Sequence, residues 1–193
     1  MKSTLDTKTA ILDAAQELVQ SKSFSGVSFQ KLASMVGIKK GSMYHHFASK
    51  DELTIALLDR VHDQMKAAFD SGQGKPALKR LNYYLKIYRH YIVPGKNMCP
   101  VGAFVGEWGA MSNEVKFSIR RNFKMQLSSL TDIVRSGVES GEFTPLSSDP
   151  DTVATWILAT VQGSLSCDRV FENDNTFQLS SKLIFDFLTA NRG

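Results

Sequence analysis

The sequence predicts an all-α protein of about nine helices. Nearly every segment repeats its apolar residues with the 3.6-residue period of an amphipathic helix, and almost none alternates as a strand does. Glycine, proline, serine and asparagine separate these segments at short intervals. We expect helices over residues 6–22, 28–35, 39–46, 49–71, 75–92, 100–111, 113–140, 150–171 and 176–190.

The first three predicted helices are supported by local signals. One face of the first carries Ile11, Ala14, Ala15, Leu18 and Val19. Ser28 suits the N-cap of the second, and Val27 and Leu32 flank it in the arrangement of a hydrophobic staple. Gly37 provides a sharp turn before the short third helix, which we expect to face inward through Met43 and Phe47.

The later helices are longer and have similar signals. Ser49 suits an N-cap, and Asp51 and Glu52 place negative charge in the first turn of the fourth helix, near the positive end of its dipole. Helix 113–140 repeats an apolar stripe of Phe123, Leu127, Leu130, Val134 and Val138. We divide the chain into residues 1–52 and 53–193.

The net charge of +4 lies entirely in the first quarter of the chain. Residues 1–50 hold seven lysines and three acidic residues, whereas residues 51–193 hold 16 of each sign. Such asymmetry indicates a polyanionic partner for the first quarter, most simply nucleic acid. A basic solvated surface is the alternative that charge alone leaves open.

Composition argues against several classes of protein. There is no apolar run of the roughly 20 residues that span a bilayer, and the N-terminal residues lack a signal-peptide core, so we expect a cytoplasmic protein without membrane contacts. The two cysteines, Cys99 and Cys167, are expected to be thiols. No metal-ligand spacing, phosphate loop or catalytic triad motif is present, so we expect neither a cofactor nor an enzyme.

Residues 28–46 have the pattern of a DNA-binding helix-turn-helix. Two short helices are joined by a turn at Gly37, and the second opens with Lys39, Lys40, Gly41 and Ser42. In this motif the N-terminal part of the second helix meets base edges in the major groove. A helical hairpin with a basic, solvated face is the structural alternative.

The same residues resemble the N-terminal domain of the tetracycline-repressor (TetR) family. The resemblance rests on Phe29–Ala33, Val36–Ile38, Lys40–Phe47 and Ser49–Leu53. It implies a homodimeric repressor on double-stranded, near-palindromic operator DNA. It also implies base or groove contacts from Gln30, Lys40, Ser42, Tyr44 and His45, and phosphate contacts from Ser28, Lys31, His46 and Lys50.

A signal site is expected in residues 53–193. Tyr84 and Tyr88 share one face of helix 75–92, and Phe104 and Trp108 share one face of helix 100–111. Aromatic side chains with a few hydroxyl groups suit a pocket for a small apolar ligand. Ordinary core packing is the alternative for each of these residues.

Cys99 is a candidate sensor. Pro100 suits the first position of a helix, which would make Cys99 the N-cap, and Lys96 lies three residues earlier. Both features favour the thiolate. A buried, inert thiol is the alternative.

A second resemblance concerns this cysteine. Met98–Phe104, Gly137–Phe143 and Gln162–Leu165 resemble the TetR subgroup that includes repressors of N-ethylmaleimide reductase and of acrylate metabolism. It implies an electrophile or other small molecule as effector, with Cys99 as sensor. Some members link this cysteine to a later lysine, but residues 166–169 here read Ser-Cys-Asp-Arg. A Cys99–Cys167 disulfide, alkylation and reversible ligand binding stay open.

The last two helices carry apolar stripes too broad for the surface of a monomer. We expect them to pair with the same helices of a second copy in a four-helix interface, whereas burial within one chain is the alternative. The predicted interface residues are Trp156, Thr160, Gly163, Ile184 and Phe187.

Two other functions compete with a ligand-released repressor. One is a thiol-dependent enzyme that acts on electrophiles through Cys99, although such an enzyme does not need a basic helix-turn-helix. The other is a DNA-organising protein without a ligand, which would bind DNA without sequence preference.

Overall fold

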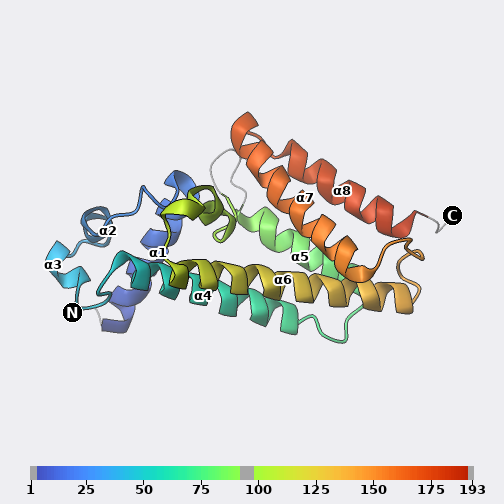
Figure 1. Ribbon diagram of the computed structural model, residues 1–193, viewed down its shortest axis with the longest axis horizontal. Coiled ribbons are helices and arrows are strands. Elements are labelled where there is room, and N and C mark those ends of the chain that lie inside the picture. The colour runs from blue at the N-terminus through green and yellow to red at the C-terminus, as the bar shows by residue number, and fades with distance from the viewer. Residues whose placement is uncertain (1–3, 92–97, 191–193) are drawn as a thin grey trace. The chain divides into compact units, whose positions relative to one another are not determined.

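A computed structural model describes residues 4–91 and 98–190, and over these residues the all-α prediction is confirmed (Figure 1). The helices are α1 (Thr4–Lys22), α2 (Phe29–Val36), α3 (Lys40–Met43), α4 (Lys50–Asp70), α5 (Ala77–Tyr91), the 3₁₀ helix η1 (Gly102–Ala110), α6 (Asn113–Glu139), α7 (Pro150–Phe171) and α8 (Asn175–Thr189). Within these described ranges, no helix is long and apolar enough to cross a membrane.

Two helices differ from the prediction. The segment expected as an α-helix over residues 100–111 is a 3₁₀ helix with a kink at Glu107, where φ is −112° and ψ is 25°. Its Gly102, Gly106 and Gly109 lower the stability of an α-helix, which explains the tighter, interrupted form. The third helix has only four residues and ends at Met43, after which the amides of Tyr44, His45 and His46 bond to carbonyls three residues back instead of four.

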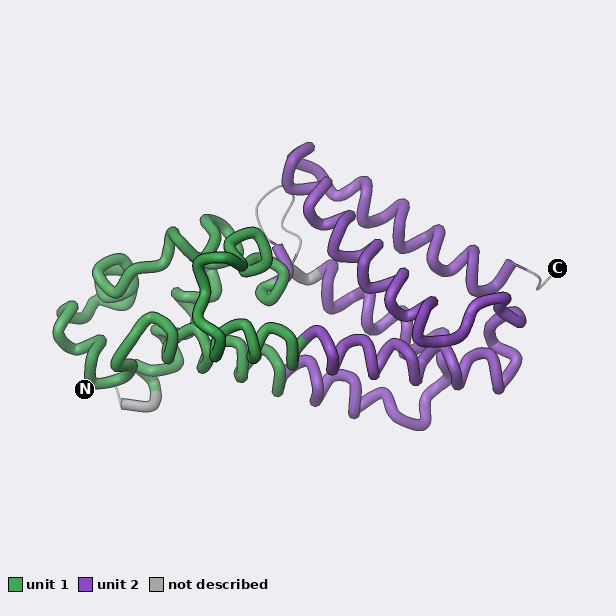
Figure 2. Tube along the Cα trace, in the orientation of Figure 1, with its two compact units in different colours: residues 1–63, 100–122 green, residues 64–99, 123–193 purple. Residues whose placement is uncertain are grey.

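The chain divides into two compact units (Figure 2). Unit 1 contains Met1–Asp63 and Pro100–Asn122, and unit 2 contains Gln64–Cys99 and Phe123–Gly193. This division differs from the expected one at residue 52, because the first part of α6 is bonded to the first part of α4. Asn122 Nδ2 donates to the Leu58 carbonyl at 3.2 Å, and Arg121 pairs with Asp59 at 2.6 Å.

Unit 1 has a closed apolar core formed by the first four helices. Its fully buried side chains include Ile11, Ala15, Val19, Leu32, Met43, Phe47, Leu53 and Leu57. Arg60 fixes α4 against α1, because its guanidinium pairs with Asp13 at 2.6 Å and donates to Gln16 Oε1 at 2.8 Å and to the Leu12 carbonyl at 3.0 Å. These contacts hold the short α2 and α3 on a rigid support.

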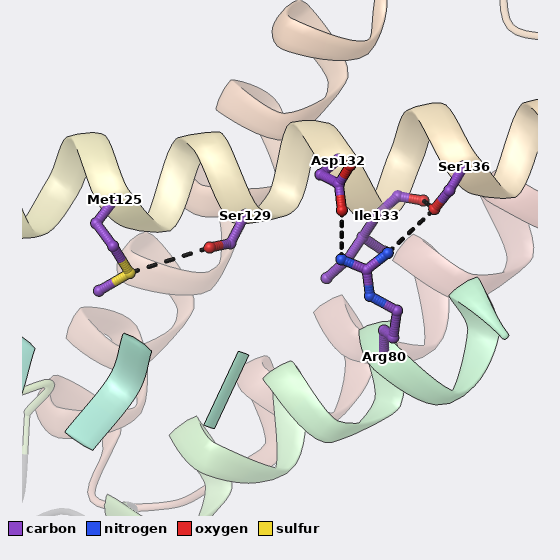
Figure 3. A network of polar contacts seen from close by, with 6 residues as sticks. All are labelled: Arg80, Met125, Ser129, Asp132, Ile133 and Ser136. Carbon is purple, nitrogen blue, oxygen red and sulfur yellow. Dashed lines mark hydrogen bonds and ion pairs between the residues drawn. The ribbon is translucent and has the colours of Figure 1, made fainter. Parts of the chain in front are cut away.

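In unit 2, α5 is fixed at its first turn and along its side. The Glu142 carboxylate accepts from the Ala77 and Leu78 amides at 2.9 and 3.0 Å, and so satisfies the N–H groups at the start of the helix. Arg80 then reaches α6, where it pairs with Asp132 at 2.6 Å and donates to Ser136 Oγ at 3.3 Å (Figure 3).

The helices α7 and α8 lie side by side (Figure 1), and each begins with a carboxylate cap. Asp149 caps α7 by accepting from the Thr152 amide at 2.9 Å, with Pro150 at the first helical position. The cap of α8 comes from within α7: the buried Asp168 carboxylate accepts from the Thr176 amide at 2.8 Å and from the Phe177 amide at 2.9 Å. Asp168 therefore sets the angle at which α8 returns along α7.

We expect Asp168→Ala to lower the free energy of unfolding by about 1–3 kcal/mol, because the buried Phe177 amide and the partly buried Thr176 amide lose a charged acceptor. Asp174→Ala is the matched control: Asp174 is the N-cap of α8 but makes no capping hydrogen bond, so its loss should cost less than about 0.5 kcal/mol. Urea denaturation followed by circular dichroism measures both. Equal losses in the two variants would show that Asp168 does not hold α8.

Candidate nucleic-acid interface and buried sensor cluster

The turn between α2 and α3 follows from two residues. Ser28 Oγ accepts from the Lys31 amide at 3.3 Å and so caps α2. At its other end, Gly37 takes a left-handed conformation with φ of 76°, which residues with a Cβ rarely adopt. The amides of Gly37 and Ile38 then both donate to the Ala33 carbonyl, at 3.0 and 2.9 Å, which ends the helix and starts α3 three residues later.

Most of the predicted DNA-contact residues lie on the surface. Tyr44 is 55% exposed, while Met43 and Phe47 are buried and anchor this segment to the core. Ser42, His46 and Lys50 are half-buried. The exposed members of the predicted set are Ser28, Gln30, Lys31, Lys39, Lys40, Gly41, Tyr44 and His45.

Several of these residues surround one surface hollow of about 400 Å³. It is lined by Val27, Ser28, Phe29, Gln30, Lys40, Tyr44, Ala48, Ser49 and Lys50. The edge of the Tyr44 ring meets Phe29 with 5.1 Å between ring centroids, which fixes the tyrosine at this site. Ser49 was predicted only as a helix cap, a role that it also fills by accepting from the Glu52 amide at 3.0 Å.

Two lysines predicted to contact phosphates have partners within unit 1. The Lys50 ammonium lies 3.8 Å from the centroid of the Phe24 ring, where burial lowers its pKa and the carboxylates of Glu107 and Asp51 act in the opposite direction. Lys31 Nζ donates to the Gly26 carbonyl at 3.3 Å. Phosphate contacts from these two residues stay a prediction, and each ammonium keeps N–H donors that its present partner does not use.

Sequence reasoning assigned no role to Glu107, which joins η1 to the loop after α1. Its Oε1 accepts from the Ser25 amide at 3.0 Å, and this hydrogen bond, with others from Ser23 and Ser25, lowers the pKa of the carboxyl. Beside it, the Phe24 and Phe104 rings pack with 5.8 Å between centroids. The signal for Glu107 in the sequence was weak: it is a single acidic residue in a glycine-rich segment.

The four aromatic residues predicted to line one pocket are divided between the units. Phe104 is buried in unit 1, where Trp108 also lies with the Arg120 guanidinium 4.9 Å and the Lys116 ammonium 5.8 Å from its ring. Tyr84 and Tyr88 belong to unit 2. A shared pocket of these residues stays a prediction.

Unit 2 contains a buried polar cluster around the two tyrosines. Both rings are fully buried and meet edge to face with 5.0 Å between centroids. The Tyr88 hydroxyl donates to Gln126 Oε1 and accepts from Gln162 Nε2 at 3.4 Å. Within the described residues, Gln126 Nε2 is buried without a hydrogen-bond partner, and the Tyr84 hydroxyl interacts with the Tyr88 hydroxyl without reaching good hydrogen-bond geometry. A buried donor without a partner is costly and suits a site that a polar ligand completes.

Both tyrosines are neutral phenols at physiological pH. Burial raises the pKa of Tyr84 and of Tyr88 far above the ordinary tyrosine value; at Tyr84 the interaction with the Tyr88 hydroxyl acts in the opposite direction, and the electrostatic interaction with nearby Cys99 adds to the rise at both. The cluster therefore offers hydroxyl and amide groups rather than fixed charge. Gln126 and Gln162 were not predicted, although a glutamine within the apolar stripe of helix 113–140 was a usable signal.

The prediction that Cys99 is an N-cap is wrong. The N-cap of η1 is Val101, because Pro100 and Val101 form a turn before the helix begins. Cys99 therefore lies two residues before the N-cap, and its side chain is only 1% exposed. The dipole argument for a thiolate at Cys99 therefore fails, and Lys96 lies outside the described residues. Among the described residues neither cysteine forms a disulfide, and Cys167 is exposed on α7.

An apolar face extends over α7 and α8. Its exposed large residues are Trp156, Val170, Phe171, Leu179, Leu183 and Phe187. Trp156 and Phe187, at 40% and 47% exposure, meet with 5.0 Å between ring centroids, and Gly163 is exposed with open space beside it. Thr160 is half-buried. Ile184 was predicted at this surface, which is wrong: it is fully buried, because it lies about 100° around the helix from Leu183.

Comparison with known proteins identifies the class. Residues 11–57 match the family of bacterial regulatory proteins called tetR, and residues 77–184 match the tetracyclin repressor-like C-terminal domain. The chain belongs to this family and is a DNA-binding transcriptional regulator.

Particular relatives agree with this assignment. The chain is 24% identical to the HTH-type transcriptional repressor NemR of Escherichia coli K12 over 176 residues, which are 86% of this chain and 87% of NemR. The crystal structure of reduced E. coli NemR matches with a TM-score of 0.79 at 19% identity, over 95% of this chain and 98% of that one. A TetR-family regulator from Agrobacterium tumefaciens matches with a TM-score of 0.90 at 21% identity, over 97% and 100%.

We expect Glu107→Ala to destabilise unit 1 in a pH-dependent way. Because its pKa is lowered in the folded state, the Glu107 carboxylate stabilises the fold above the ordinary glutamate value of 4.5 and loses this effect as the pH falls through the folded value. The effect at pH 7 should stay below about 1 kcal/mol, because the group is largely exposed.

Thermal denaturation between pH 3 and pH 7 tests this expectation. The difference in Tm between Glu107→Ala and wild type should be present at pH 7 and shrink toward pH 3. Glu139→Ala, which removes another exposed carboxylate, is the control. A Tm difference that is constant across this pH range would contradict the proposed role of the carboxylate.

Proposed function

We propose that this regulator is a homodimeric repressor that binds a near-palindromic operator and is released by a small-molecule or electrophile signal acting in unit 2. The observation that carries the proposal is the hollow at the helix-turn-helix, where α2, α3 and the start of α4 present basic and polar side chains together. The related NemR is itself a transcriptional repressor.

The DNA contacts are proposed from exposure and position. Lys40, Gly41 and Tyr44 lie on the exposed side of the segment whose inner side holds Met43, so they are placed to reach base edges and the groove wall. Ser28 and Ser49 begin α2 and α4, where backbone amides and helix dipoles favour phosphate. The net charge of +4 in residues 1–50 adds a sequence-independent attraction to DNA.

Dimerisation is proposed through the apolar face of α7 and α8. Exposed tryptophan, phenylalanine and leucine side chains in one patch are costly in water and are typical of protein interfaces. Gly163 weakens its own helix yet has open space beside it, which suits the close approach of a partner helix. The proposed interface residues are Trp156, Thr160, Gly163 and Phe187.

The signal is proposed to act at the buried cluster of Tyr84, Tyr88, Gln126 and Gln162, beside Cys99. The unpaired Gln126 amide donor suits reversible binding of a polar molecule, and the Cys99 thiol offers a covalent route. Burial of Cys99 argues against a thiol-dependent enzyme, because turnover needs a thiol that substrate reaches repeatedly. We infer that the protein acts in the cytoplasm, where both thiols stay reduced.

Lys40→Ala should weaken binding to DNA from directly upstream of the protein's own gene by about 1–3 kcal/mol, the cost of one lost base contact. Lys124→Ala is the control, because it removes the same charge from an exposed position of unit 2. Fluorescence anisotropy across a salt series measures both variants. If Lys40→Ala binds like wild type at every salt concentration, the proposed docking of α3 is incorrect.

Trp156→Glu combined with Phe187→Glu should convert the dimer to a monomer, because two charges would be buried in an apolar interface. Analytical ultracentrifugation measures the mass, and circular dichroism confirms that the fold is retained. Phe117→Glu is the control: Phe117 is 66% exposed but belongs to unit 1. A double variant that stays dimeric would place the interface elsewhere.

N-ethylmaleimide should modify Cys167 rapidly and Cys99 slowly in the native protein, because one thiol is exposed and the other is buried. Release from DNA should follow modification of Cys99, since an adduct there must displace packed side chains. Mass spectrometry measures how fast each cysteine peptide is modified, and fluorescence anisotropy measures how fast the protein leaves the DNA. The two time courses are then compared.

Cys167→Ser should still be released, and Cys99→Ser should stay bound. Release of Cys99→Ser at the wild-type rate would exclude the covalent route. The search would then turn to reversible ligands of the same cluster.

A further inference from the structure

A second concentration of positive charge lies outside the DNA-binding segment. Residues 71–106 contain six lysine or arginine residues and no aspartate or glutamate. The net charge of residues 51–193 is zero, because acidic residues before and after this run offset its positive charge. The run is therefore not visible in the net charge of that part of the chain. The run includes all of α5.

α5 is amphipathic, with a buried side and an exposed side. Tyr84 and Tyr88 point into the core, whereas Lys79, Asn82, Lys86 and Arg89 are exposed on the outer side. Arg80 does not contribute to this outer charge, because Asp132 and Ser136 of α6 hold its guanidinium (Figure 3). Within residues 6–89 and 98–190, neither Lys86 nor Arg89 forms an ion pair.

A hollow of about 420 Å³ lies between this outer side of α5 and one side of α8. It is lined by Asn82, Leu85, Lys86, Arg89, Phe177, Gln178, Ser181, Lys182 and Phe185. Leu85 and Phe177 are buried and Phe185 is half-buried, so they form an apolar floor. Ser181 Oγ is buried here without a hydrogen-bond partner among the described residues.

The charge around this hollow is positive. Lys86 and Arg89 have no ion pair with any described residue, whereas Lys182 is paired with Asp186 at 2.5 Å and contributes less. Two other hollows of unit 2 lack this combination. One of about 700 Å³ has as many acidic as basic side chains in its lining: Lys66 and Arg80 are paired with Asp70 and Asp132, and Arg135 shares the hollow with Asp151. Another of about 380 Å³ has Lys75, Lys79 and Lys86 but few apolar residues.

We propose that the hollow between α5 and α8 binds a small anionic amphiphile, with a carboxylate or phosphate head on Lys86 and Arg89 and a short acyl or aryl body on Leu85, Phe177 and Phe185. Unpaired cations at the rim favour an anion, and the apolar floor favours a hydrocarbon body over a free inorganic ion. The Ser181 hydroxyl offers a further polar contact.

This site is separate from those already proposed. On α8, residues 178, 181, 182 and 185 face the hollow, whereas the exposed Leu179, Leu183 and Phe187 lie on another side of the helix. On α5, the hollow uses the side opposite to the buried tyrosines. Ligand binding here is therefore compatible with the proposed dimer and with a signal at Cys99.

Isothermal titration calorimetry of the full chain with octanoate tests the proposal. Octanoate should bind, and octanol (the same body without charge) and inorganic phosphate (charge without the body) should each bind at least about tenfold more weakly. Binding should also weaken as salt is added, because the rim charges are exposed. Circular dichroism confirms that each variant below is folded.

Two variants and one matched control locate the site. Lys86→Gln with Arg89→Gln should weaken octanoate binding at least about tenfold, and Ser181→Leu should do so without any change in charge, by filling the hollow. Lys75→Gln with Lys79→Gln removes the same charge from the neighbouring hollow and should leave binding within about twofold of wild type.

Three results would overturn the proposal: no heat of binding with millimolar octanoate, equal binding of octanol, or equal losses in the two double variants. Equal losses would show a general electrostatic attraction rather than a site. Because none of these measurements involves DNA or Cys99, their failure leaves the proposed repressor function standing, and failure of the DNA experiments leaves this site standing.

Discussion

The exposed face proposed to bind DNA depends on the left-handed turn at Gly37. Because this residue ends α2 by placing two amides on the Ala33 carbonyl, α3 starts immediately and Met43 and Phe47 reach the core. The side chains between these anchors are thereby turned outward, Tyr44 among them. A residue with a Cβ would strain this turn, and the surface that gathers residues from α2, α3 and α4 would lose its arrangement.

Unit 2 shows how one helix serves several chemical environments. The inner side of α5 holds two neutral phenols in a dry core with glutamine amides, while its outer side carries unpaired cations in water. Glu142 and Arg80 fix the helix from its first turn, so neither side is free to rotate toward the other. Rigid attachment lets a buried neutral cluster and an exposed charged hollow lie on the same helix.

The prediction of helices and their caps from the sequence was largely confirmed, because these are local properties. Ser28 and Ser49 cap the helices expected of them, and Gly37 makes the expected turn. The predictions failed where a local sequence signal was opposed by another feature of the chain. Pro100 suits a helix start, but the glycine-rich segment behind it forms a kinked 3₁₀ helix that begins later, which leaves Cys99 as a buried thiol. Ile184 was taken for a surface residue because the apolar stripe of α8 is continuous on two sides.

The sequence by itself determined the helical fold, the helix-turn-helix and its family, because apolar period, caps and turn residues act between neighbours along the chain. Only the tertiary structure decided which polar groups are paired. It placed Lys50 over Phe24, joined Glu107 to Ser25, and enclosed Gln126 and Gln162 with the tyrosines. Such pairings join residues that are 26 to 82 positions apart. Periodicity reports which side of a helix is buried, but not which distant side chain lies against it.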